Sequence, residues 1–159
     1  PPGSLRIYEF RRGKFRAFVG FYRLESETHA IGDFTPVNHH EFLVIERDSG
    51  QGATAFFKKI FKIDIRENEG GNVEKKDVVD LLDIADPHDL DGDGANVFRF
   101  PFTTIEDVLV LDEDRILVAN DNNYPFSVGR PPAIDNDEII VLSLPRKLRL
   151  DRRLGDQRR

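Results

Sequence analysis

The sequence predicts an all-β protein, and more specifically a β-propeller fragment with two blades and part of a third, each blade a four-stranded antiparallel sheet. Two observations carry this prediction. Apolar residues recur at every second position in nearly every apolar segment, as in strands that bury one face. One stretch also recurs without a gap, so that residues 31–48 match residues 105–122.

The strands follow one another in a regular order along the chain. Residues rich in Gly, Asn, Asp and Pro separate them, and such residues favour turns. The predicted strands are residues 4–10, 14–24, 31–37, 41–46, 57–65, 75–84, 105–111, 115–120 and 138–144.

The repeat gives these strands an architecture. Ile31, Asp33, Leu43 and Val44 recur as Ile105, Asp107, Leu117 and Val118. Each copy is a strand, a tight turn and a second strand, followed by a loop and a third strand, and the first copy adds a fourth. Four antiparallel strands per repeat form a propeller blade, and residues 4–24 then supply two strands of a preceding blade. A β-sandwich made of hairpins is the alternative, because it shows the same alternation.

Composition restricts the class of protein and its partners. The chain has 23 basic and 29 acidic residues and a net charge of −6, which argues against nucleic acid as a partner. No segment approaches the roughly 20 apolar residues of a membrane helix, so we expect no membrane partner. We expect a partial propeller domain at residues 1–145 and a basic, solvated extension at residues 146–159, where residues 147–150 could add a strand. Because Met is absent, we read the chain as a fragment, a processed product or a trimmed form. Because roughly four to eight blades close a ring, we expect the parent chain to supply the missing N-terminal blades.

Oxygen-bearing side chains follow or precede several of the predicted strands. In a propeller blade, the loop that enters strand one and the loop that leaves strand two open at the same end, which we call the mouth. Carboxylate and amide oxygens there suit Ca²⁺, and less well Mg²⁺, rather than zinc or copper. The expected metal ligands are Glu46, Glu106, Asn120, Asp121, Asp89, Asp91 and Asp93.

Each of these groups also has a plainer interpretation. The run Asp89-Leu-Asp-Gly-Asp-Gly94 has the first half of a calcium loop, but Phe100 stands where an EF-hand needs Glu, and a solvated acidic turn needs the same residues. The block of Asn and Asp at residues 120–123 either binds metal or substrate, or caps a strand end. Glu46 is either functional or paired with Arg47 or Arg130.

Two segments resemble a known family. Residues 42–48, with the sequence FLVIERD, and residues 100–126, which contain FPFTTIEDV and ILVANDNNYPF, are similar to the phytase-like family, labelled "esterase-like activity of phytase". The likeness runs from about residue 5 to residue 144 and covers the C-terminal half of such proteins. It implies a β-propeller, secretion or a periplasmic location in bacteria, and phosphoester or ester hydrolysis. The positions carried over are Glu46, Glu106, Asn120, Asp121, Asn122 and Arg130.

A phosphorylated substrate is an anion, and it approaches an acidic mouth favourably only where bound cations invert the local field. We therefore expect a Ca²⁺-dependent hydrolase of a small phosphorylated substrate. The candidate catalytic residues are Glu106, Asp107 and Asp121, and the candidate substrate-binding residues are Arg47, Asn122, Asn123 and Arg130, with Lys58 and Lys59 on the rim. The alternative is a non-catalytic propeller module with a structural metal, because no pair of residues forms an evident general base with its orienting partner.

Overall fold

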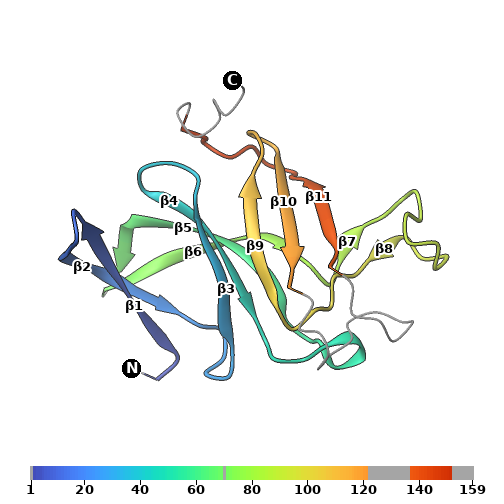
Figure 1. Cartoon of the computed structure of the whole chain (residues 1–159), viewed down its shortest axis with the longest axis horizontal. Helices are drawn as coiled ribbons and strands as arrows, with labels where there is room; N and C mark the ends of the chain where they lie inside the picture. Colours follow the sequence, from blue (N-terminus) through green and yellow to red (C-terminus); the bar gives the residue numbers. More distant parts are fainter. Residues whose placement is uncertain (1, 70, 122–136, 152–159) are drawn as a thin grey trace.

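The computed structural model of the chain describes residues 2–69, 71–121 and 137–151 (Figure 1). These residues form strands and one short 3-10 helix, η1 (Gly52–Thr54), and contain no α-helix, which confirms the predicted all-β class. Nothing helical in this part of the chain has the length and apolar composition needed to cross a bilayer. The strands are β1 (Ser4–Arg11), β2 (Lys14–Arg23), β3 (Ala30–Pro36), β4 (Glu41–Arg47), β5 (Lys58–Glu69), β6 (Asn72–Asp80), β7 (Ile84–Ala85), β8 (Val97–Phe98), β9 (Ile105–Val110), β10 (Arg115–Asn120) and β11 (Ile139–Ser143).

The first repeat folds into the predicted four antiparallel strands, β3-β4-β5-β6, which we call the first sheet. Its strand β4 is buried on both faces. Leu43 and Ile45 belong to one core cluster, and Val44 between them belongs to another. A strand covered on both sides gains from apolar residues at every position, which explains the unbroken apolar run that the sequence shows here.

The second repeat forms the second sheet, in the order β9-β10-β11, and it reproduces the pairing of the first. Val44 pairs with Phe34 on the first hairpin, and the matching residues Val118 and Val108 pair on the second. The sequence repeat is therefore also a repeat of strand register.

The two sheets stack with their first strands side by side, β3 against β9. The Val108 amide donates a hydrogen bond to Asp33 Oδ2 at 2.9 Å. A Cβ atom on Gly32 would lie 1.9 Å from the carbonyl oxygen of Ile105, so only glycine permits this approach. Repeated antiparallel sheets stacked in this way are consistent with neighbouring blades of a propeller fragment.

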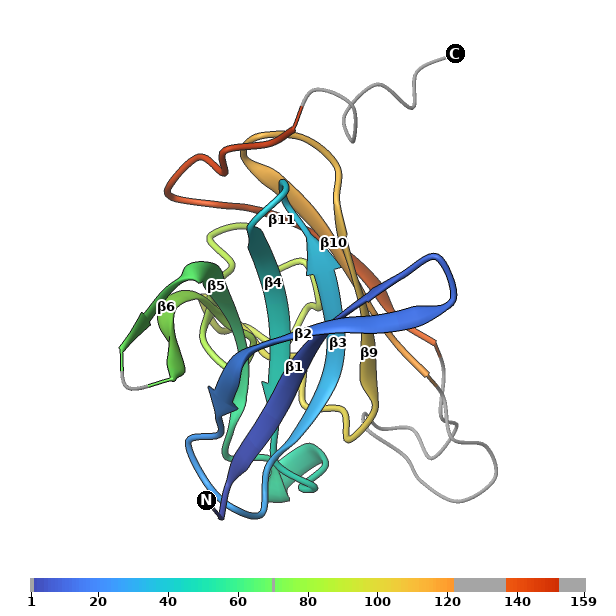
Figure 2. The ribbon, with the colours of Figure 1, turned by 90° about the vertical axis from the view of Figure 1, so that its left-hand side faces the viewer.

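The hairpin β1–β2 packs on the other face of the first sheet. Its Tyr22 and Leu24 share a core with Val44, Ile63 and Val73, and β2 meets the edge strand β6 through one parallel pair. Figure 2 shows the hairpin crossing in front of β3 and β4. The hairpin thus occupies the position that the sequence predicts for part of a preceding blade.

The C-terminal segment differs from its prediction. Residues 147–150 form no strand, and Leu148 is buried in the core shared by the two sheets rather than solvated. The Leu148 amide donates to the Glu113 carbonyl at 2.6 Å, and the Asp151 amide donates to the Val37 carbonyl at 3.0 Å. The first residues of the expected extension therefore contact the domain, while its division from the domain at residue 145 stays a prediction.

Candidate functional site

The ends of β4 and β10, which the sequence predicts at the mouth, do lie at the same end of the two stacked sheets. Glu46 at the end of β4 pairs with Ile31, and Asn120 at the end of β10 pairs with Ile105. Because Gly32 touches the Ile105 carbonyl, the two pairs lie at one end of neighbouring sheets. This part of the predicted geometry agrees with the structure.

The side chains at these strand ends nevertheless point into different interfaces. Glu46 shares a face of β4 with Val44, which packs toward the β1–β2 hairpin. Asn120 shares a face of β10 with Val118, which packs toward the first sheet. The first sheet therefore separates the two side chains, and the expectation that both line one metal site is not met.

Glu46 is fully buried, and protein donors satisfy both of its carboxylate oxygens. Oε1 accepts from the Glu25 amide at 2.6 Å and faces His29 Nδ1 at 2.9 Å, while Oε2 accepts from Tyr22 Oη at 2.8 Å and Lys75 Nζ at 3.0 Å. Burial alone would raise the pKa of Glu46, but these bonds outweigh it and hold the pKa below its ordinary value. Glu46 is thus the centre of a buried network between the first sheet and the hairpin.

The side chain of Asn120 makes the hydrogen bonds of a capping residue. Its Oδ1 accepts a hydrogen bond from the Glu138 amide at 2.7 Å, and Nδ2 donates to the Asp121 carbonyl at 3.3 Å. The carboxylates of Glu106, Asp107 and Asp121 are exposed. Asn122, Asn123 and Arg130 lie outside the described residues, so their predicted roles stay predictions.

Arg47 and Lys58 form the cationic part of this end of the first sheet. They are paired across β4 and β5 and face the second sheet, as Ile45 and Ile60 do. The buried Nε of Arg47 has no hydrogen-bond partner among the described residues. Lys58 is fully buried rather than on a rim, and its ammonium donates to the Asp48 carboxylate and to the Asp48 and Gly50 carbonyls.

In the Lys58–Asp48 pair, burial disfavours both charges, and the contact between the two side chains favours them. Burial lowers the pKa of Lys58, and the Asp48 carboxylate opposes this shift. For Asp48, burial acts to raise the pKa, but bonds from Lys58 and the Phe56 amide hold it below its ordinary value. Lys58 therefore stabilises the loop after β4. Because its ammonium is buried and bonded to that loop, Lys58 does not assist substrate binding from the rim, as the sequence analysis expected.

The acidic loop between β7 and β8 gathers the three carboxylates that the sequence singles out. Ligand oxygens of Asp89, Asp91 and Asp93 lie within 4.8 Å of one another, and all three side chains are exposed. Asp89, Gly92 and Gly94 have positive φ angles of 50°, 72° and 82°, which bend the loop. Among the described residues, this is the one group of three such ligands close enough to hold a metal ion.

The acidic loop does not lie at the expected mouth. Figure 1 shows it projecting beyond β7 and β8, away from the ends of β4 and β10. The loop is held by its own side chains: Asp93 Oδ1 accepts from the Ala95 amide at 2.7 Å in an Asx turn, and Asp89 Oδ1 accepts from the Gly94 amide at 3.0 Å across the loop. The cluster could hold a hard cation, but separately from Glu106 and Asp121.

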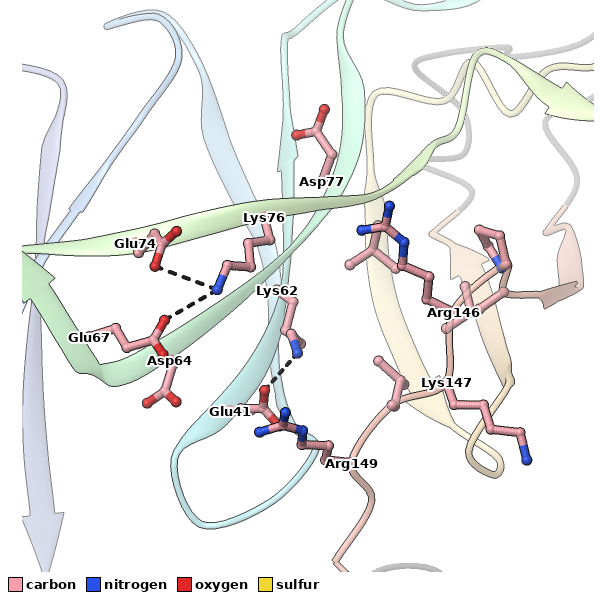
Figure 3. A pocket seen from close by; sticks show the side chains of 14 residues that line it. Glu41, Lys62, Asp64, Glu67, Glu74, Lys76, Asp77, Arg146, Lys147 and Arg149 are labelled. Atoms are coloured by element: carbon pink, nitrogen blue, oxygen red, sulfur yellow. Dashed lines mark hydrogen bonds and ion pairs between the residues drawn. The ribbon is translucent and has the colours of Figure 1, made fainter.

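The sequence did not predict a cleft at the opposite end of the first sheet. The cleft measures about 930 Å³ and lies between β5, β6 and the C-terminal segment (Figure 3). Its charged walls are already paired in part, Lys62 with Glu41 at 2.6 Å and Lys76 with Glu67 at 3.3 Å. Acidic and basic side chains are equal in number along it: Glu41, Asp64, Glu67, Glu74 and Asp77 against Lys62, Lys76, Arg146, Lys147 and Arg149.

Comparison with known proteins decides the family. The model of the family described as "Phytase-like: Esterase-like activity of phytase" matches residues 1–124. The chain belongs to the phytase-like family. No curated protein and no solved structure matches it.

The match to the phytase-like family confirms the resemblance seen in the sequence, with a shorter extent. It includes the hairpin, the first sheet, strands β9 and β10 and the whole block at residues 120–123, and it ends at residue 124. The acidic loop falls inside the matched region, whereas Arg130, β11 and the cleft-lining segment from Leu144 fall outside it.

Proposed function

We propose that this phytase-like chain is part of a Ca²⁺-dependent hydrolase of small phosphorylated or ester substrates, in a protein that is secreted or periplasmic. The observation that carries the proposal is the Asp89, Asp91 and Asp93 cluster within a chain of this family. Without a cation, a chain of net charge −6 repels a phosphate monoester.

The acidic loop fits a calcium ion by its chemistry. It offers only hard carboxylate oxygens, they come from alternate residues, and Gly92 and Gly94 supply the tight turn that such loops need. Because the loop is exposed, water can complete the coordination shell, and Ca²⁺ takes six to eight ligands at flexible geometry, whereas Mg²⁺ demands a stricter one. A bound cation would supply positive charge that attracts anionic substrates to the chain.

The chain's own residues at the mouth would handle the substrate. Arg47, which is half-buried, would donate from its guanidinium group to an anionic oxygen in a charge-assisted bond. The exposed carboxylate of Asp121 would accept a proton from an attacking water, and the exposed carboxylates of Glu106 and Asp107 would orient that water. By resemblance to the family, Asn122, Asn123 and Arg130 would complete the substrate contacts.

The test is hydrolysis of p-nitrophenyl phosphate and p-nitrophenyl acetate by the 159-residue chain, with Ca²⁺, with Mg²⁺ and with a chelator. The proposal expects turnover that Ca²⁺ supports best. Asp121→Asn should lower kcat about 100-fold, which is typical of a lost general base, while Asp83→Asn, a matched exposed carboxylate elsewhere, should leave it unchanged. A folded chain that hydrolyses neither ester under any of these conditions contradicts the enzyme.

One observation favours the second candidate, a non-catalytic module with a structural cation. Protein partners fully engage Glu46 and Lys58, two of the charged residues nearest the mouth. For such a module, Ca²⁺ should raise the melting temperature through the acidic loop while neither ester is hydrolysed.

A further inference from the structure

The second sheet exposes an apolar face on the side away from the first sheet. At the centre of this outer face, Leu117 on β10 pairs with Leu109 on one side and with Val141 on the other. Ile139 on β11 is 66% exposed. The large exposed apolar side chains of this face are Leu109, Leu111, Ile139 and Val141.

The repeat shows that residues in these positions belong to a covered face. Leu111 and Leu117 match Val37 and Leu43 of the first sheet in the sequence repeat. Ile139 occupies the place of Ile60, because each pairs with the residue two positions after Leu117 or Leu43. Val37, Leu43 and Ile60 are all fully buried, since the second sheet packs on them. The outer face of the second sheet thus has the composition of a blade face with its cover missing.

A second exposed apolar surface lies at the other end of the stack, on the β1–β2 hairpin. Phe15 packs edge-to-face against Phe10 at 5.2 Å and Tyr8 at 5.9 Å between ring centroids, and Tyr8 packs likewise against Phe18 at 5.6 Å. Phe15 is nevertheless 74% exposed, and none of the four rings belongs to the core under the hairpin. Figure 1 shows the hairpin and the second sheet on opposite sides of the first sheet.

The two exposed surfaces carry opposite charge. The hairpin, residues 4–23, has six basic residues and one acidic residue. The second sheet, residues 105–121 with 137–143, has eight acidic residues and one basic residue. Complementary charge steers association and fixes its orientation. It also argues against an anionic lipid surface as the common partner, because the second sheet would be repelled by it.

We propose that a second copy of this chain covers both surfaces, with the hairpin of each copy packed on the outer face of the other copy's second sheet. Each contact joins two different surfaces, and a twofold axis makes the two contacts equivalent and closes the pair. Two copies together place four sheets and two hairpins in one ring, and if each hairpin counts as part of a blade, their number lies within the range of roughly four to eight blades that closes a propeller. The cover that the repeat predicts for the outer face of the second sheet is then the hairpin of a second copy.

The test is the mass of the 159-residue chain in solution, measured by sedimentation velocity over a series of concentrations. We expect a species of twice the 18.2 kDa chain mass, which dissociates more readily as salt is raised. Phe15→Glu and Ile139→Glu should each weaken the dimer about 30-fold or more, as expected for central interface residues. Phe56→Glu is the control, since Phe56 is 82% exposed and lies on neither surface. Circular dichroism confirms that each variant is folded.

Mixing the two variants separates this arrangement from others. A Phe15→Glu copy retains its second sheet, and an Ile139→Glu copy retains its hairpin, so the mixture regains one of the two contacts and should form a pair more tightly than either variant alone. A monomeric wild type, a dimer that neither variant weakens, or a mixture no tighter than its components overturns the proposal. So does a monomer that cosediments with phosphatidylserine vesicles and loses this property in Phe15→Glu.

Discussion

Replacing Glu46 by Gln removes the charge at the centre of the network that joins the first sheet to the β1–β2 hairpin. Removing one partner of a buried ion pair costs about 3–5 kcal/mol, because the other charge stays buried. Lys75 would keep Glu25 at 2.7 Å and the ring faces of Phe61 and Tyr22 at 4.3 and 4.7 Å. These contacts place the expected loss in the free energy of unfolding at the lower limit, about 3 kcal/mol.

Urea unfolding at neutral pH measures this loss, and its pH dependence tests the cause. The pKa of Glu46 is lower in the folded chain than its ordinary value of 4.5, so its charge stabilises the fold above pH 4.5. This stabilisation disappears as the pH falls through the folded pKa, whereas Glu46→Gln has no such group to protonate. The difference between the two proteins should therefore shrink on acidification. The exposed Glu9→Gln serves as the control.

A loss below about 0.5 kcal/mol, the range of ordinary surface substitutions, would refute the buried network. So would a difference between wild type and Glu46→Gln that stays constant from neutral pH to below pH 4.5. Either result would also remove the argument that Glu46 is unavailable to a metal ion.

Three further substitutions test other parts of the fold, each by chemical or thermal unfolding. Gly32→Ala should cost about 2–3 kcal/mol, because its Cβ atom would meet a backbone oxygen of β9 at 1.9 Å; an unchanged stability would contradict the sheet stacking. Lys58→Ala should cost about 3 kcal/mol by leaving Asp48 without its ammonium partner, and Asp48→Asn in the same chain should recover part of that loss. Asn120→Ala should cost about 1–2 kcal/mol through the lost bond to the Glu138 amide, and Asn120→Asp, which keeps the acceptor, should cost less.

The strands and their repeat were predictable because they depend on local patterns. Alternation of apolar residues indicates which residues share a face, and the matched segments predict two equivalent hairpins. The structure adds the equivalent pairs, Val44 with Phe34 and Val118 with Val108. The separation of Glu46 from Asn120 could also have been predicted from the sequence. Each side chain points to the side of its strand's even-numbered apolar residues, so repeat-equivalent side chains enter successive interfaces instead of one.

The parts that were not predicted depend on tertiary contacts. Lys58 is two residues before Ile60 and so lies on the same face of β5, but only the packing of the second sheet shows that this face is buried. The charged cleft exists because Leu148 enters the core and draws a basic segment along the first sheet. This segment is rich in Arg and Lys, as a solvated tail is. Nothing in its periodicity distinguishes a segment packed on the domain from a solvated tail.

Calorimetric titration of the chain with Ca²⁺ tests the proposed cation site most directly. The account predicts one saturable site that Asp91→Asn abolishes and that Asp83→Asn, an exposed carboxylate outside the acidic loop, leaves intact. Absence of Ca²⁺ binding by the folded chain, or binding that Asp91→Asn leaves unchanged, would contradict it.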